Sequence, residues 1–265
     1  MSEISTVGAS FREDLRAYAA AGFDGIGIWE MKLGGADADL AAFLESGLRT
    51  TNCVPLVPSI LPNTVIEGPL DVEERIESLC ASMDRFAHYE PESVLCLTGP
   101  AGEFGETEAR RIAIDGLQRI AAAATAAGVR LGLEPIHASE RDALTLVTSI
   151  PEALDLLDEA GLPDVGIMVD LWHLSDTPTI ERDLREHVAR ITGVHVADRF
   201  PPPRVDRALP AARSAELIAI LVDAGFQGSW DVEIFGDPER PDSIWSLPVD
   251  EAARRAYEAA VGVLP

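Results

Sequence analysis

Residues 129–173 read VRLGLEPIHASERDALTLVTSIPEALDLLDEAGLPDVGIMVDLWH and predict a strand, a helix and a second strand in succession. The two predicted strands, 129–135 and 164–171, are short apolar runs, and each carries an acidic residue near its carboxyl end. The predicted helix 151–160 has a proline in its first turn and is followed by Gly161, as helix boundaries commonly are. Two strands that are joined by a helical crossover lie parallel in one sheet. This segment therefore predicts an α/β fold with a parallel sheet.

The same alternation of strand and helix continues in both directions from this segment. We expect eight strand–helix pairs, without a linker or a change of composition between them. The predicted strands are 4–9, 25–29, 49–57, 93–97, 129–135, 164–171, 191–197 and 229–235, and the predicted helices are 11–21, 37–46, 71–89, 107–127, 151–160, 180–189, 215–224 and 250–261.

Eight such pairs in 265 residues match a (β/α)8 TIM barrel. The alternative is a doubly wound open sheet, which favours a glycine-rich phosphate loop after its first strand. Gly8 is followed by Ala-Ser-Phe, which is not such a loop. We therefore expect residues 1–265 to form one barrel domain.

Composition and charge exclude several classes of partner. The chain has 21 basic and 45 acidic residues, a formal charge of −24, which would repel nucleic acid and an anionic membrane surface. The three cysteines, Cys53, Cys80 and Cys96, lie far apart in apolar surroundings and form no zinc motif, so we expect reduced thiols in a cytoplasmic protein. No stretch resembles a signal peptide or a membrane span.

Four successive predicted strands each carry a residue of metal-ligand type inside an apolar frame: Glu134, Asp170, His195 and Glu233. Functional residues of a TIM barrel lie at the carboxyl ends of its strands. An ionised carboxylate in apolar surroundings is costly unless it is paired or coordinated. One divalent cation would satisfy all four side chains, and three carboxylates with one imidazole suit Mn²⁺, Mg²⁺ or Co²⁺, with Zn²⁺ as an alternative. The pattern calls for no organic cofactor.

The segments LGLEPIH (131–137), VGIMVDLWH (165–173), GVHVAD (193–198) and WDVEIF (230–235) resemble the sugar phosphate isomerase/epimerase family. This family belongs to the xylose isomerase-like TIM barrels, a superfamily that also contains the AP-endonuclease-2 fold. The segments AGFDGIGIWE (21–30) and AGFQGSWDVEIF (224–235) extend the resemblance over almost the whole chain.

The resemblance implies one divalent metal ion on Glu134, Asp170, His195 and Glu233, with Mn²⁺ favoured. It also implies that Glu134 and Glu233 form an acid/base pair, which moves a proton through a metal-stabilised enediolate. By the same resemblance His173 is a substrate-binding histidine, and Asp198 contacts the substrate or supports a ligand.

Further residues are candidates for substrate binding. Trp29 and Trp172 either stack on a sugar face or pack in loops, and His137 either enters the pocket or caps the following loop. Arg207 and Pro210 match positions of the family, but Ala-Ala-Arg at 211–213 replaces its glycine turn, so the loop conformation must differ. Arg199 and Arg204 in the same loop are alternative sites for an anionic group.

The ligand set predicts the intermediate better than the product. The first hypothesis is an isomerase or epimerase of a sugar, sugar phosphate or cyclitol. A lyase or dehydratase of a keto-sugar, keto-inositol or dehydroshikimate-type substrate is the alternative, and a non-catalytic barrel is a third. An AP endonuclease needs more histidines than the five of this chain. The expected partner is thus a small carbohydrate or keto acid, and the chain is a candidate for a homodimer.

Overall fold

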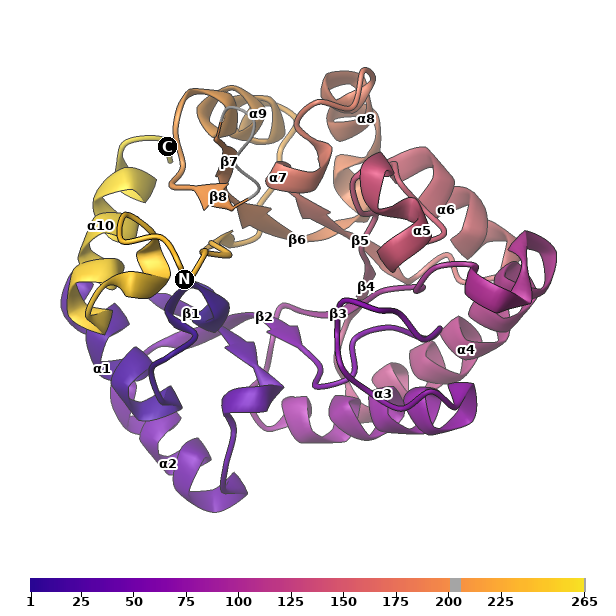
Figure 1. Ribbon diagram of the computed structural model, residues 1–265, viewed down its shortest axis with the longest axis horizontal. Helices are drawn as coiled ribbons and strands as arrows, with labels where there is room; N and C mark the ends of the chain where they lie inside the picture. The colour runs from indigo at the N-terminus through magenta and orange to yellow at the C-terminus, as the bar shows by residue number, and fades with distance from the viewer. Residues whose placement is uncertain (201–205, 265) are drawn as a thin grey trace.

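Seven parallel strands form one curved sheet in the computed structural model, which describes residues 1–200 and 206–264 (Figure 1). Their order in the sheet follows the order along the chain, as expected when each strand is joined to the next by a helical crossover. The strands of this sheet are β1 (Gly25–Trp29), β2 (Arg49–Val54), β3 (Ser93–Cys96), β4 (Leu131–Leu133), β5 (Gly166–Asp170), β6 (Ile191–Val196) and β9 (Trp230–Val232). Two short strands, β7 (Asp198–Arg199) and β8 (Arg207–Ala208), pair antiparallel outside this sheet.

The first two residues close the sheet into a barrel. The amide of Gly27 in β1 donates to the carbonyl of Met1 at 2.9 Å, and the amide of Ser2 donates to the carbonyl of Val232 in β9 at 2.9 Å. Residues 1–2 thus take the place of an eighth strand between β9 and β1. The prediction of a single-domain TIM barrel is confirmed.

The predicted first strand, 4–9, is wrong. Residues Glu3–Thr6 form a 3₁₀ turn instead. This turn is linked to the segment 232–234 through the side chain of Ser5 and not through the backbone hydrogen bonds of a strand. The Ser5 hydroxyl donates to the carbonyl of Val232 at 3.3 Å and accepts from the amide of Ile234 at 2.8 Å. Local β-propensity of the Ile-Ser-Thr-Val run therefore yields to these tertiary contacts.

Helices surround the sheet as an outer ring (Figure 1). Glycines in the left-handed conformation end several of them, for example Gly22 after α1, with φ of 108°. The helices are α1 (Phe11–Ala21), α2 (Ala36–Ser46), α3 (Val72–Ala87), α4 (Glu106–Ala127), α5 (Arg141–Leu144), α6 (Ile150–Glu159), α7 (Leu171–Leu174), α8 (Ile180–His187), α9 (Ala212–Asp223) and α10 (Val249–Val261). Within residues 1–200 and 206–264, no helix has both the length and the apolar character needed to cross a membrane.

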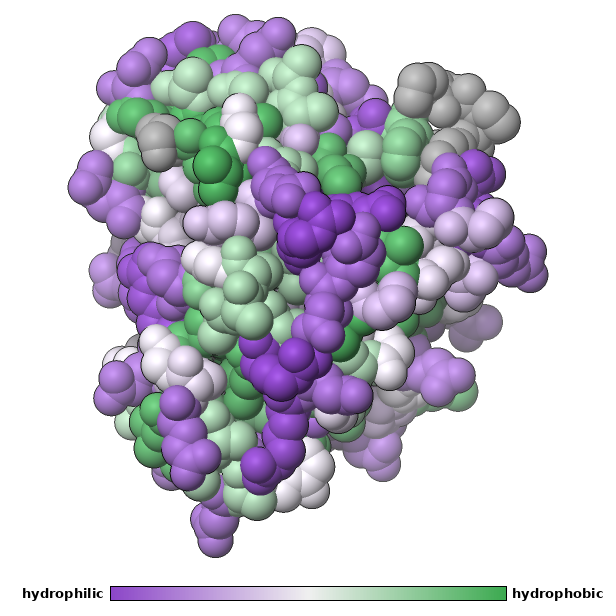
Figure 2. Space-filling view, turned by 90° about the vertical axis from the view of Figure 1, so that its left-hand side faces the viewer, coloured by the Kyte–Doolittle hydropathy of each residue, from purple (hydrophilic) through white to green (hydrophobic). Residues whose placement is uncertain are grey.

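The outer face over α1 and α10 is largely hydrophilic, with smaller apolar areas between the polar side chains (Figure 2). Arg16 of α1 pairs with Asp250 of α10 on this surface, with Nη1 and Oδ1 2.8 Å apart. The apolar residues of these helices are turned inward, where Leu15 and Ala256 are buried. This amphipathic division fixes each helix against the sheet.

The apolar residues form two separate clusters. The larger one lies between the sheet and the helices, and the smaller one consists of Val54, Leu95, Leu97, Ile136 and Met168. The barrel interior is tightly packed, since a Cβ at Gly193 would lie 2.3 Å from Oδ1 of Asn52 and 2.7 Å from Sδ of Met168. The smaller cluster reaches the carboxyl ends of β2, β3 and β4, where it forms part of the site described next.

Candidate active site

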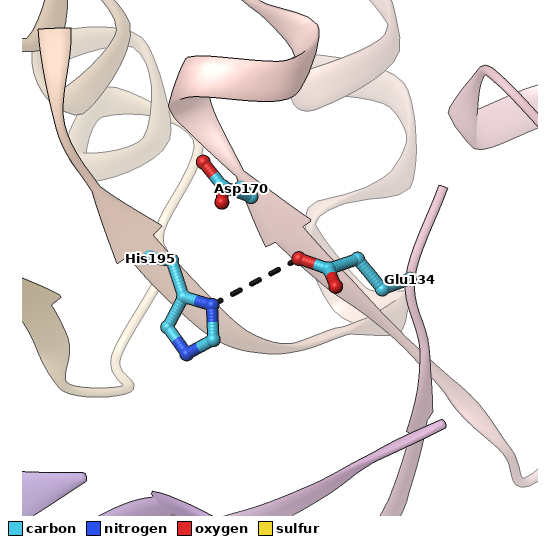
Figure 3. Close-up of side chains that lie close together, drawn as sticks. All are labelled: Glu134, Asp170 and His195. Carbon is cyan, nitrogen blue, oxygen red and sulfur yellow. Dashed lines mark ion pairs between the residues drawn. The ribbon is translucent and has the colours of Figure 1, made fainter. Parts of the chain in front are cut away.

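Four predicted ligand residues meet where neighbouring strands end. Glu134 follows β4, Asp170 is the last residue of β5, His195 lies in β6 directly opposite Asp170, and Glu233 follows β9. These strands are neighbours in the sheet, and all four side chains are buried. In the close-up the imidazole of His195 and the carboxylate of Glu134 are turned toward each other, beside Asp170 (Figure 3).

Three of the four form a group of the size that a metal ion requires. One ligand atom each from Glu134, Asp170 and His195 lie within 4.8 Å of one another. The Nδ1 atom of His195 is 3.8 Å from Oε1 of Glu134 and 3.3 Å from Oε2 of Glu233. Both ring nitrogens of His195 are buried without a hydrogen-bond partner in the described part of the chain. A buried imidazole whose ring nitrogens make no hydrogen bond, next to two carboxylates, is a donor set that fits a divalent cation.

Arg207 joins the fourth ligand residue to this group. Its Nη1 atom donates to Oδ2 of Asp170 at 2.6 Å and to Oε2 of Glu233 at 2.8 Å. The guanidinium lies over the ring of Phe235, with Cζ 4.4 Å from the ring centre. The other carboxylate oxygen of Glu233, Oε1, accepts from the hydroxyl of Ser2 at 3.3 Å. Arg207 thus neutralises negative charge of Asp170 and Glu233 that a bound cation would otherwise balance.

Burial and mutual charge perturb the acid–base properties of the cluster. Burial raises the pKa of Glu134 to about 7, although His195 acts in the opposite direction. Burial opposes ionisation of His195 as well, but the carboxylates of Glu233 and Glu134 outweigh it and raise its pKa to about 10. Burial also disfavours the anion of Asp170, yet Arg207, His173 and His195 together with the Trp172 amide outweigh this effect and lower the pKa of Asp170. The site therefore holds one carboxyl group that titrates near neutrality.

His173 is a neutral hydrogen-bonding group of the same site. Burial lowers its pKa to about 3, although Asp170 acts in the opposite direction. Its Nδ1 accepts from the backbone amide of His137 at 3.3 Å, and its Nε2 lies 3.4 Å from Nη2 of Arg207. These two contacts orient the ring beside the carboxylates.

A cavity of about 490 Å³ opens above the cluster. Six of the residues singled out in the sequence line it: Trp29, Glu134, Trp172, His173, Arg207 and Glu233. Most of the remaining described residues that line the cavity are apolar.

Three predicted substrate-binding residues, Asp198, Arg199 and His137, are not among those that line this cavity. Asp198 accepts from the amides of Arg213 and Ser214 at 3.2 Å and 2.8 Å, at the start of α9. Arg199 donates from Nε to the carbonyl of Trp172 at 2.9 Å and lies over its ring. In the structure the side chain of Asp198 thus contacts the start of α9, and that of Arg199 contacts Trp172.

His137 takes the loop role that the sequence left open. Its Nδ1 accepts from the amide of Ser139 at 3.2 Å, and its Nε2 pairs with the carboxylate of Asp176. Arg204, the other candidate for an anionic group, lies outside the described residues.

Ser2 and Phe235 belong to the site but were not predicted. Phe235 could have been found, because residues at i and i+2 of an extended segment share a face and Glu233 precedes it by two positions. Ser2 carries no local signal. Only closure of the barrel brings it to Glu233 and to Trp29, whose Nε1 donates to the Ser2 hydroxyl at 2.9 Å.

Solved structures share this architecture. A protein from Sinorhizobium meliloti 1021 superimposes with a TM-score of 0.86 at 22% identity, over 100% of this chain and 97% of that one. The IOLI protein with a bound zinc atom gives 0.79 at 20% identity, over 100% and 96%. D-allulose 3-epimerase from Methylomonas sp. in complex with D-allulose gives 0.73 at 18% identity, over 99% and 95%. At such identities the likeness shows the fold alone.

No curated protein matches this chain in sequence. A family model, however, matches residues 15–259, which is most of the chain. By that match the chain belongs to the xylose isomerase-like TIM barrel family.

Proposed function

We propose that this protein is a divalent-metal-dependent isomerase or epimerase that moves a proton next to the carbonyl group of a carbohydrate-like substrate. The observation that carries the proposal is the convergence of Glu134, Asp170 and His195 within 4.8 Å under a cavity, with Glu233 beside His195. Membership of the family and the epimerases among its structural neighbours support a sugar-modifying enzyme.

The cation would be held by Glu134, Asp170, His195 and Glu233. We favour Mn²⁺, since three carboxylates and one imidazole form a hard, oxygen-rich set, with Mg²⁺, Co²⁺ and Zn²⁺ as alternatives. The zinc atom bound by the similar IOLI protein supports the proposal that this chain holds a divalent ion. When bound, the cation would polarise the substrate carbonyl and stabilise the negative charge that develops on its oxygens.

Glu134 and Glu233 are the proposed acid/base pair. A general base works best when its pKa lies near the working pH, and burial places the pKa of Glu134 at about 7. Burial also raises the pKa of Glu233, although His195 and Arg207 oppose it. The two carboxylates come from β4 and β9, on either side of His195, so that one can remove a proton and the other can return it.

The remaining cavity residues would orient the substrate. His173 is neutral and offers a hydrogen bond to a hydroxyl or carbonyl oxygen. Arg207 presents a guanidinium at the same end, and Trp29 and Trp172 offer ring surfaces. These residues would hold the reacting carbon between the two glutamates.

Exchange of the substrate proton with solvent tests the proposal, because isomerisation, epimerisation and dehydration all begin with its removal. Mn²⁺-loaded protein would be incubated in D₂O with a panel of α-hydroxyketones, and deuterium incorporation would be followed by NMR. We expect Glu134→Gln and Glu233→Gln each to lower the exchange rate by roughly 10²–10⁴-fold.

The matched control is Glu45→Gln, since this carboxylate is exposed on α2 and is not among the residues that line the cavity. This variant should exchange at a rate close to that of the wild type. Undiminished exchange in both Gln variants of the acid/base pair would refute the proposal, and so would a wild-type protein that exchanges no member of the panel.

A further inference from the structure

The cavity has two chemically different halves, which follow the order of the strands. The polar half comes from the ends of β4, β5 and β9 and from β8, and consists of Glu134, His173, Arg207 and Glu233. The opposite half comes from β2, β3 and the residue after it, the segment after β4, the loop between β2 and α3, and helix α5. Its residues, which we call the apolar wall, are Val54, Ile66, Leu95, Leu97, Ile136 and Leu144.

The apolar wall is one continuous packed surface. Val54, Leu95, Leu97 and Ile136 are buried and form a single cluster with Met168. Ile66 and Leu144 are half-buried and pack against this cluster from the outside. The four buried residues lie in strands or shortly after them, so this part of the wall is rigid and its chemistry stays the same while a ligand enters.

This wall is unsuited to a polyhydroxylated chain. Each sugar hydroxyl that leaves water needs a new hydrogen-bond partner, and none of the six side chains provides one. The indole nitrogen of Trp29, at the edge of the wall, already donates to the Ser2 hydroxyl. An alkyl or aryl group, in contrast, gains from burial against the same surface.

The wall is equally unsuited to a phosphate group. Arg207 is the one cation among the described residues that line the cavity, and it is already paired with Asp170 and Glu233. Glu140 also lines the cavity, four residues before Leu144 in the sequence, and its carboxylate would repel an anion. A ligand that extends along the wall is therefore expected to be uncharged there.

We propose that the substrate is an uncharged α-hydroxyketone whose carbon body is an apolar alkyl or aryl group, rather than a polyhydroxylated or phosphorylated chain. This inference rests on the proposed function, which places the hydroxyketone at the polar half. The apolar wall then selects the body of the molecule.

Three probes with a common hydroxyketone head separate the alternatives: benzyl hydroxymethyl ketone, erythrulose and dihydroxyacetone phosphate. Their affinities would be measured by isothermal titration calorimetry with Mn²⁺-loaded protein. We expect the benzyl probe to bind at least about tenfold more tightly than either of the others, since each unpartnered hydroxyl costs a factor of that order.

A pair of leucine variants locates the effect. Leu144→Asn adds an amide to the half-buried edge of the wall, and Leu44→Asn makes the same change on the exposed surface of α2. Leu144→Asn should weaken binding of the benzyl probe several-fold while sparing erythrulose, and Leu44→Asn should change neither affinity. Thermal unfolding of both variants confirms that each is folded before titration.

Binding and exchange distinguish this inference from the proposed function. Tighter binding of erythrulose or of the phosphate, or an equal effect of the two leucine variants, would overturn the inference while leaving proton exchange intact. Preferred binding of the benzyl probe without exchange of any probe would support the apolar wall and contradict the proposed chemistry. Absence of binding by all three probes would contradict both.

Discussion

Arg207 occupies the position in the site where positive charge matters most. Its Nη1 atom lies 2.6 Å from Oδ2 of Asp170 and 2.8 Å from Oε2 of Glu233. Both carboxylates are buried, so this contact lowers the cost of keeping them ionised. A divalent cation at the same carboxylates would lie close to the guanidinium and would be repelled by it.

We therefore expect Arg207→Met to bind Mn²⁺ more tightly than the wild type, on the order of tenfold, because one neighbouring positive charge is removed. Without metal the same variant should be less stable by about 3 kcal/mol, since two buried carboxylates lose their partner. Competition with a chelating dye measures the affinity, and Arg207→Lys, which keeps the charge, is the control. Weaker Mn²⁺ binding by Arg207→Met would mean that the guanidinium supports the cation instead of opposing it.

Among single residues, those at or near the ends of strands could be predicted from the sequence. Ser2, which only closure of the barrel brings to the site, could not. Glu134, Asp170, His195 and Glu233 were predictable, because barrel strands present their carboxyl ends on one side. Asp198 matched the same rule, yet its carboxylate accepts amides at the start of α9. A sequence pattern cannot distinguish these two uses of an aspartate, since both place it just beyond a strand.

At the scale of elements, the segment before α1 departs most from its prediction. Its residues Glu3 and Thr6 belong to a buried polar network and form no strand. Thr6 donates to Oδ1 of Asp14 in α1 at 2.6 Å, and Oδ2 of the same carboxylate lies 2.5 Å from Nζ of Lys32, which follows β1. Glu3 accepts the amide of Trp29 through Oε2 at 2.9 Å, while its Oε1 has no hydrogen-bond partner in the part of the chain described. The network fixes the segment that completes the barrel.

Glu3 makes stability depend on pH. Burial raises its pKa well above the usual value of 4.5, and the neighbouring charge of Asp14 adds to this effect, although Lys32 opposes it. The folded state thus binds a proton more tightly than the unfolded state does. The contribution of Glu3 to stability is greatest below pH 4.5 and is lost as the pH rises toward its raised pKa in the folded state.

We expect Glu3→Gln to remove this loss. Its free energy of unfolding relative to the wild type should rise between pH 5 and pH 8, by on the order of 1 kcal/mol. Urea unfolding at the two pH values measures the difference. Glu13→Gln is the matched control: hydrogen bonds from Ser10 lower the pKa of Glu13, so this carboxyl group is ionised in both states over this range and the substitution should leave the pH dependence nearly unchanged. An unchanged difference for Glu3→Gln would show that Glu3 titrates alike in both states.

At the scale of the whole molecule, alternation of strand and helix was sufficient to predict the barrel, but not the chemistry of its cavity. Leu95, Leu97 and Ile136 read as ordinary core residues, since apolar strand positions face either the helices or the barrel interior. Only closure of the sheet shows that they line a cavity. The part of the site where polar residues interrupt apolar strands could be predicted from the sequence. The part where apolar residues line the cavity could not.

The central claim is that Glu134, Asp170, His195 and Glu233 hold one divalent cation. Elemental mass spectrometry of protein dialysed after incubation with Mn²⁺ tests it most directly, with the Glu134→Ala/Glu233→Ala double variant and His195→Ala alongside the wild type and His187→Ala as control. We predict about one cation per chain in the wild type and in His187→Ala, and loss of it in the other two. No cation in the wild type, or equal retention in all four proteins, would contradict the account.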